Sequence, residues 1–89
     1  MSDRPVTITG FTDDLGDAAE NRDLSQRRAS ALRDYLVSKG VDGSHLQVVG
    51  MGPSRPKESN ATSDGRAANR RIEILIDTTH QEPRAAAKT

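Results

Sequence analysis

The 89-residue sequence contains no cysteine, and its only aromatic side chains are Phe11 and Tyr35. The absence of cysteine excludes disulfide bonds and thiolate metal sites. Because 33% of the residues are hydrophobic and only two carry aromatic rings, the chain can bury only a small aliphatic core. No apolar run has the length of a signal peptide or a transmembrane helix, so the sequence predicts no membrane span in this chain.

The sequence also lacks a net charge, because 13 Lys and Arg residues balance 13 Asp and Glu residues. Nucleic acids and anionic membranes attract strongly basic surfaces, so we expect no nucleic-acid partner. The two histidines, His45 and His80, have no further ligand at metal-binding spacing, and no catalytic serine motif or phosphate-binding loop is present. We therefore expect no metal, no cofactor and no enzymatic activity.

Alternating apolar and polar residues predict three strands, at 6–10, 45–52 and 71–77. Between the first two strands, Ser25 is a good N-cap and Gly40 is suited to the left-handed position after a helix. These signals predict a long helix over about 25–39, preceded by a long loop. One or two further helical turns are expected shortly before the last strand.

The order strand, helix, strand, strand predicts an α+β fold, a two-layer βαββ sandwich in which the main helix packs on a three-stranded sheet. The last strand is expected to return antiparallel. Residues 78–89 carry no periodic apolar pattern and are predicted to form a disordered tail. The domain is therefore expected to span residues 5–77.

Arg28 has an unexpected position on the predicted helix. On a helical wheel it falls in the middle of the arc marked by Leu24, Leu32, Tyr35 and Leu36. A buried guanidinium without an anion is costly, so a nearby carboxylate is one explanation. The other is that the side chain leaves sideways and covers apolar surface with its stem. The helical pattern favours neither.

The loop before this helix offers a candidate anion in Asp13. This residue lies three positions after the first predicted strand, where the ligand sites of parallel βα units gather. A carboxylate and a guanidinium held apart across a pocket suit a zwitterion, because each charge meets its opposite. From the residues alone, a plain salt bridge between Asp13 and Arg28 has at least equal weight.

Four motifs follow one another along the chain: G-F-T-D-D-L-G at 10–16, N-R-D-L-S-Q-R-R-A at 21–29, G-M-G-P-S-R-P at 50–56 and G-R-A-A-N-R-R-I-E at 65–73. In this combination the sequence resembles the OmpA C-terminal-like domain, shared by outer-membrane proteins of the OmpA type, peptidoglycan-associated lipoproteins and the flagellar stator protein MotB. The resemblance runs from about Val6 to Ile76. It implies part of a β-α-β-α-β-β fold.

The resemblance further implies noncovalent binding of peptidoglycan through the diaminopimelate residue of its stem peptide, which anchors a protein or an envelope layer to the cell wall. The ligand-binding positions of the family match Asp13 and Arg28, accompanied by Thr12, Asn21 and Arg70. The expected location is the periplasm or cell envelope, as a domain of an exported protein, although this chain carries no signal peptide.

The sequence departs from the family pattern in two places. Phe11 stands where the family usually has His or Tyr, and the first strand and helix of the family fold are absent from this chain. A sheet without its first strand exposes an edge to which a second copy could add. The alternative function is therefore an assembly module, a homodimer through the exposed sheet edge, with weakened or lost ligand binding.

Overall fold

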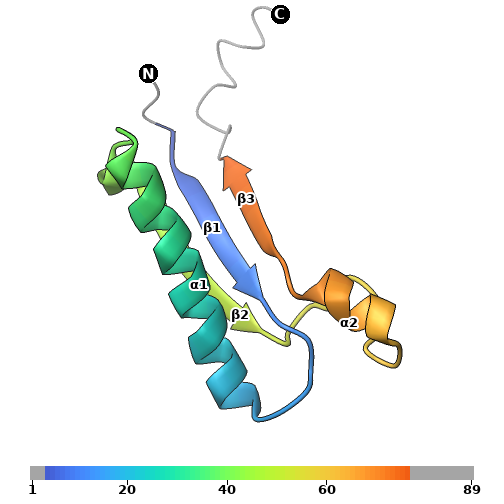
Figure 1. The fold of residues 1–89 in the computed structure, drawn as a ribbon. Coiled ribbons are helices and arrows are strands. Elements are labelled where there is room, and N and C mark those ends of the chain that lie inside the picture. Colours follow the sequence, from blue (N-terminus) through green and yellow to red (C-terminus); the bar gives the residue numbers. More distant parts are fainter. Residues whose placement is uncertain (1–3, 77–89) are drawn as a thin grey trace, which may run out of the picture.

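Residues 4–76 are the part of the chain described by this computed structural model (Figure 1). The elements of this part are β1 (Val6–Phe11), α1 (Ala18–Ser38), the short 3₁₀ helix η1 (Gly43–His45), β2 (Leu46–Gly52), α2 (Ser63–Asn69) and β3 (Ile72–Ile76). The predicted α+β fold with a three-stranded sheet is confirmed, and α2 supplies the helical turns expected before the last strand. The predicted tail at 78–89 lies outside the described residues.

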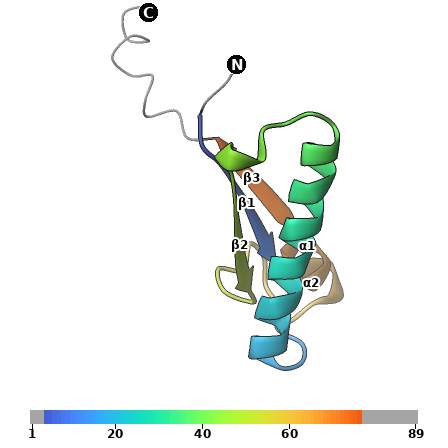
Figure 2. The same cartoon turned by 90° about the vertical axis from the view of Figure 1, so that its left-hand side faces the viewer.

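The sheet has the order β2-β1-β3, with β1 parallel to β2 and antiparallel to β3. Figure 2 shows α1 lying against one face of this sheet. The helix packs on β1 and β2, and Figure 1 shows β3 on the side of β1 away from α1. The register between β1 and β2 shifts between Gly10 and Phe11, because Phe11 pairs with Gly52 and Met51 is an extra residue, a bulge, in β2. Bulges of this kind redirect the side chains that follow them.

Helix α1 begins about seven residues earlier than predicted, at Ala18 instead of about Ser25. Its N-cap is Asp17, whose side chain accepts a hydrogen bond from the backbone N–H of Ala19 at 3.0 Å. Glu20 follows three residues later, as in a capping box, where a carboxylate also suits the positive end of the helix. The predicted start at Ser25 is therefore wrong, and most of the second half of the predicted loop is helical.

The predicted end of α1 is confirmed at Gly40, which has the left-handed φ of +102°. The N–H of Gly40 donates to the carbonyl of Val37, and the N–H of Val41 donates to the carbonyl of Leu36, both at 3.0 Å. These two bonds form a Schellman motif, in which glycine adopts the left-handed conformation without a Cβ penalty.

The face of α1 that packs on the sheet is built from small residues. Ser25 and Ala29 are fully buried, and Gly10 of β1 lies so close to the backbone of Ser25 that an added Cβ would clash with it. Arg28 is exposed, and Tyr35 is 56% exposed. The prediction that Arg28 projects into the middle of the buried face is therefore wrong. The predicted arc was marked by large apolar residues, whereas the close approach of α1 to the glycine of β1 requires small residues on the buried face.

The core is small and aliphatic, as predicted. Its buried members are Ile8, Ala29 and Leu46, with the partly buried Val6, Leu32, Leu36 and Val48 packed around them. Every residue of β3 is exposed, because α1 does not cover that strand. Ile74, which pairs with Ile8, is 54% exposed on the helix-facing side of the sheet.

Candidate ligand-binding site

The site lies where the chain leaves the carboxyl end of β1. The backbone N–H of Phe11 donates to the carbonyl of Arg71, and that of Thr12 donates to the carbonyl of Gly52, both at 2.8 Å. These bonds hold the exit of β1 between its two neighbouring strands. Thr12 and Asp13 are buried as a result, in the position after a parallel strand where a ligand site was expected.

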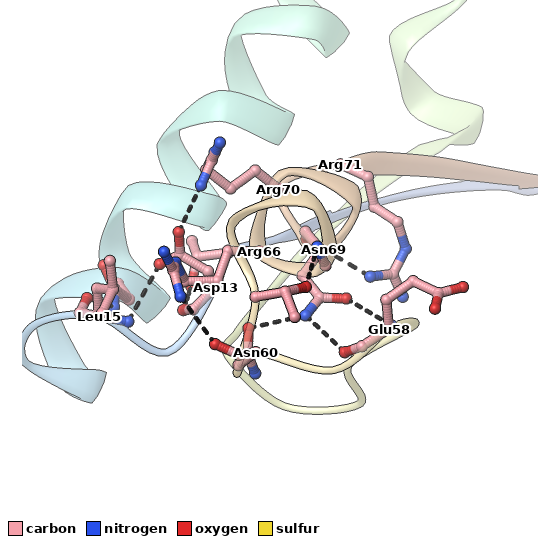
Figure 3. A network of polar contacts seen from close by, with 12 residues as sticks. Asp13, Leu15, Glu58, Asn60, Arg66, Asn69, Arg70 and Arg71 are labelled. Atoms are coloured by element: carbon pink, nitrogen blue, oxygen red, sulfur yellow. Dashed lines mark hydrogen bonds and ion pairs between the residues drawn. The ribbon is translucent and has the colours of Figure 1, made fainter.

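The carboxylate of Asp13 is engaged through both of its oxygen atoms (Figure 3). Oδ1 accepts a hydrogen bond from the backbone N–H of Leu15 at 3.1 Å, and Oδ2 pairs with Nη1 of Arg70 at 2.7 Å. The hydrogen bond from Arg70 lowers the pKa of Asp13, partial burial opposes this shift, and the Leu15 N–H and the charge of Arg66 reinforce it. Asp13 is therefore an anion at neutral pH.

Arg70 is positioned by the end of α2 and by the residue before it, Asn69, which is fully buried. The amide oxygen of Asn69 accepts hydrogen bonds from the N–H groups of Lys57 and Glu58, at 2.7 and 2.8 Å. Its amide nitrogen donates to the carbonyl of Glu58 and to Oδ1 of Asn60, at 2.9 and 2.8 Å. Figure 3 shows this clamp, which fixes the loop before α2 against the end of that helix.

Thr12 and Asn21 shape the segment around Asp13. The hydroxyl of Thr12 donates to the carbonyl of Asp13 at 2.7 Å, and the side-chain amide of Asn21 donates to the carbonyl of Leu15, also at 2.7 Å. The first bond lies within the buried turn after β1, and the second ties that turn to the first part of α1. Two of the sequence-predicted site residues thus support the turn that carries the carboxylate.

Arg28 lies on the same flank of α1 as Asn21, because the two residues are seven positions apart. Two helical turns separate them by about 10 Å along the helix axis. Within residues 4–76 the side chain of Arg28 makes no hydrogen bond or ion pair, and the carboxylate of Asp13 pairs with Arg70 instead. Of the two alternatives left open by the sequence, the plain salt bridge between Asp13 and Arg28 is not formed.

Ser25 has a role that the sequence did not indicate. Its hydroxyl donates to the carbonyl of Arg22 at 2.8 Å and accepts a hydrogen bond from the backbone N–H of Gly52 at 2.9 Å. Since the carbonyl of Gly52 accepts from Thr12, this serine connects α1 to the turn that carries Asp13. A small polar residue in the third turn of α1, followed along the chain by the glycine pair at 50 and 52, is the signal that could have found it.

Phe11 is buried beneath Arg71, whose guanidinium carbon lies 3.8 Å from the centre of the phenyl ring. Nε of Arg71 also pairs with the carboxylate of Glu73 at 2.6 Å. This is a cation–π contact, in which the ring acts as packing and as a weak partner for the charge. Phe11 therefore supports the base of the site, and its ring meets a cation where the family usually has a polar aromatic side chain.

No group of three or more His, Cys, Asp or Glu side chains within residues 4–76 is arranged to hold a metal ion. In the same part of the chain, neither helix is long and apolar enough to cross a membrane. The polar residues of the site are a carboxylate, guanidinium groups and side-chain amides. Such a set is suited to recognising charged and hydrogen-bonding groups of a ligand.

Fold and site together define a small α+β binding domain. Comparison with protein families identifies it: residues 1–70 match the model of the OmpA family. The chain belongs to this family, and it is a binding domain rather than an enzyme.

Three relatives illustrate the match. The chain is 49% identical over 75 residues to "Peptidoglycan-binding protein ArfA" of Mycobacterium tuberculosis, covering 84% of this chain and 23% of that protein. It is 50% identical over 73 residues to "Outer membrane porin F" of Pseudomonas aeruginosa, covering 81% of this chain and 21% of that protein. The crystal structure of the peptidoglycan-associated lipoprotein from Burkholderia pseudomallei has a TM-score of 0.80 and 31% identity, covering 83% of this chain and 63% of that one.

Proposed function

We propose that this domain, spanning residues 5–77, binds peptidoglycan noncovalently by recognising the diaminopimelate residue of the stem peptide. In this role it anchors a protein or an envelope layer to the cell wall. The domain then works in the periplasm or cell envelope, since that is where its ligand lies. Its ligand contacts are Asp13 and Arg28, with Thr12, Asn21 and Arg70 around them.

The observation that carries the proposal is the placement of opposite charges around the exit of β1. Asp13 is an anion held by the backbone N–H of Leu15 and by the side chain of Arg70, and Arg28 on α1 has no partner of its own within residues 4–76. The far end of diaminopimelate carries an ammonium and a carboxylate on one carbon atom. A carboxylate and guanidinium groups on facing elements meet both of these charges.

The relatives support the same ligand class. ArfA is described as peptidoglycan-binding, and the structurally similar lipoprotein as peptidoglycan-associated. Porin F is described as an outer-membrane protein, which supports an envelope location. This chain spans about a quarter of the length of ArfA and of porin F, so the proposal concerns this domain alone.

Isothermal titration with a synthetic stem peptide that contains diaminopimelate tests the proposal. We expect wild type to bind, and both Asp13→Ala and Arg28→Ala to lose binding. Each variant has a neighbour as a matched control: Asp14→Ala removes an exposed carboxylate one position away, and Arg27→Ala removes a guanidinium that pairs with Asp23 on the surface. Both controls should bind like wild type.

Two results would count against the proposal in different ways. A folded wild type that does not bind the peptide would refute the function. Unchanged binding by both Asp13→Ala and Arg28→Ala would refute the site while leaving the function in place. Circular dichroism of each variant establishes that the fold is intact before either conclusion is drawn.

The exposed β3 strand favours a second candidate, an assembly module that forms a homodimer. Within residues 4–76, β3 pairs with β1 along one edge and with no strand along the other. The helix-facing side of β3 carries an apolar row formed by Ile72, Ile74 and Ile76, all exposed. Edge pairing between two copies would extend the sheet and cover part of this row.

Sedimentation velocity separates the two candidates. If assembly is the function, wild type forms a dimer that is indifferent to wall fragments, and Ile74→Lys returns it to a monomer. Leu75→Lys is the control, because Leu75 is 68% exposed on the opposite face of the same strand and should leave the dimer intact. A wild type that stays monomeric at every concentration excludes this candidate.

A further inference from the structure

Three arginines surround the turn that carries Asp13, and they differ in the groups that hold them. Arg66 donates to the carbonyl of Asn60 at 3.1 Å, and Arg71 contacts Glu73, two backbone carbonyls and an aromatic ring. Within residues 4–76, the side chain of Arg70 has one hydrogen-bonding partner, the carboxylate of Asp13. Arg70 is therefore the one of these three arginines whose release uncovers the carboxylate of Asp13.

Arg70 also limits access to that carboxylate. The side chain of Asp13 is 10% exposed, whereas that of Arg70 is 46% exposed, and Figure 3 shows the guanidinium end of Arg70 directed at the carboxylate from the end of α2. The other carboxylate oxygen is already engaged by the N–H of Leu15. Because the side chain of Asp13 is nine-tenths buried, an ammonium group that approaches its Oδ2 atom from solvent meets Arg70 first.

We propose that Arg70 makes the site selective for a zwitterionic group over a simple ammonium, by covering Asp13 until a ligand offers a charge to each of them. This inference rests on the proposed function. When the ligand ammonium takes Asp13, Arg70 is released beside the carboxylate on the same ligand carbon. Arg70 then exchanges one carboxylate for another, and no charge is left without a partner.

The selectivity follows from the number of ion pairs. At Asp13 and Arg70, a stem peptide with diaminopimelate breaks one ion pair and forms two, one at each residue. A contact between the ligand carboxylate and Arg28 adds to the preference independently of Arg70. A stem peptide with lysine in that position has the ammonium but lacks the carboxylate, so it breaks one pair and forms one. The difference is one charge-assisted hydrogen bond, which corresponds to at least about a tenfold difference in Kd.

The test compares the Kd values of these two synthetic stem peptides, measured by isothermal titration, in wild type and in Arg70→Met. We expect wild type to prefer the diaminopimelate peptide by at least about tenfold. In Arg70→Met the affinity for the diaminopimelate peptide should fall, while the affinity for the lysine peptide stays the same or rises because Asp13 is uncovered. The preference should therefore shrink by at least about tenfold, and the part that Arg28 contributes should remain.

Arg66→Met is the matched control, because it removes the same charge from α2 one helical turn before Arg70 and leaves the pair with Asp13 in place. Both peptides carry the ammonium that meets Asp13, so this variant should shift the two Kd values by a similar factor and keep their ratio. Arg70→Lys provides a second variant of Arg70. It keeps the charge without the planar donor pair, so its preference should lie between those of wild type and Arg70→Met.

The outcomes separate this inference from the function on which it rests. If folded wild type binds neither peptide, the proposed function and this inference both fail. If wild type prefers the diaminopimelate peptide and both Arg70 variants keep that preference unchanged, the function stands and the role of Arg70 is refuted. A loss of affinity for both peptides by the same factor in Arg70→Met also refutes it, because that result describes a structural role.

Discussion

Ser25→Ala tests whether one buried hydroxyl joins α1 to the rest of the fold. Ser25 is fully buried, and its hydroxyl is the acceptor for the backbone N–H of Gly52, which is itself buried. Alanine keeps the small size that the close contact with Gly10 requires, so the substitution removes the hydrogen bond without creating a clash. The N–H of Gly52 is then left without its partner in a place from which α1 excludes water.

The magnitude follows from two opposing effects. Leaving a buried N–H unsatisfied costs about 1–3 kcal/mol. Alanine has a higher helix propensity than serine, which returns about 0.5 kcal/mol. The expected net loss in the free energy of unfolding is therefore about 1–2 kcal/mol. For a small domain with an m-value near 1 kcal/mol/M, the urea midpoint should fall by about 1–2 M.

Ser38→Ala is the matched control, because Ser38 lies on the same helix and also donates to a carbonyl three residues back, that of Tyr35. Ser38 is exposed and accepts no long-range hydrogen bond in the described part of the chain. Urea unfolding followed by circular dichroism should show little change for Ser38→Ala. If the two variants lose the same stability within about 0.3 kcal/mol, the reasoning about Ser25 is refuted.

Three further predictions concern the surroundings of the site. Because Arg70 lowers the pKa of Asp13, this pair stabilises the folded state at pH values above the ordinary pKa of aspartate. The stabilisation is lost as the pH falls below about 4. In an acid titration, the free energy of unfolding should therefore decrease more in wild type than in Asp13→Asn. Asn69→Ala removes the four hydrogen bonds made by a buried amide. We expect the free energy of unfolding to fall by more than about 2 kcal/mol and hydrogen exchange to become faster at the backbone amides of the loop before α2. Unchanged exchange in that loop would contradict the clamp. A double-mutant cycle with Phe11→Leu and Arg71→Met should give a coupling energy of about 0.5–2 kcal/mol in urea unfolding, whereas additive losses would exclude the cation–π contact.

The strands and the end of α1 could be predicted because their signals are local. Alternation of apolar residues marks each strand, and Gly40 marks the end of the helix through its own backbone conformation. The start of α1 also has a local signal, in Asp17 and Glu20, but this part of the helix lacks the large apolar residues on which the prediction relied. This first part of α1 is mostly exposed, so it needs a cap and good helix formers rather than an apolar stripe.

The buried face of α1 could not be read from α1 alone. Gly10 and Gly50 of the sheet bring the backbones of helix and strands so close that Ser25 and Ala29 fit where leucine would not. That condition is set by residues on other elements. A helical wheel gives most weight to large apolar residues. The buried face that it predicted therefore included Arg28 and missed the small residues that are buried in the structure.

The site shows the same limit at longer range. The motif resemblance placed Asp13, Arg28 and Arg70 in one site, but it did not say which arginine meets the carboxylate. Asp13 and Arg70 are 57 positions apart, and their contact depends on where α2 ends and on the clamp made by Asn69. Pairing of charges across the chain is a property of the folded backbone, which no local pattern encodes.

Because the apolar core is small, polar contacts determine the position of the site. Ser25 accepts a hydrogen bond from the N–H of Gly52, the carbonyl of Gly52 accepts one from the N–H of Thr12, and the hydroxyl of Thr12 donates to the backbone carbonyl of Asp13. Hydrogen bonds therefore run from α1 to the backbone of Asp13. Arg28 lies three residues after Ser25 on the same helix. Its distance from Asp13 is therefore set through this series of bonds, and Ser25→Ala should weaken binding of the diaminopimelate peptide as well as stability. A destabilised Ser25→Ala that binds the peptide like wild type, under conditions where it is fully folded, would show that stability and ligand geometry are set independently.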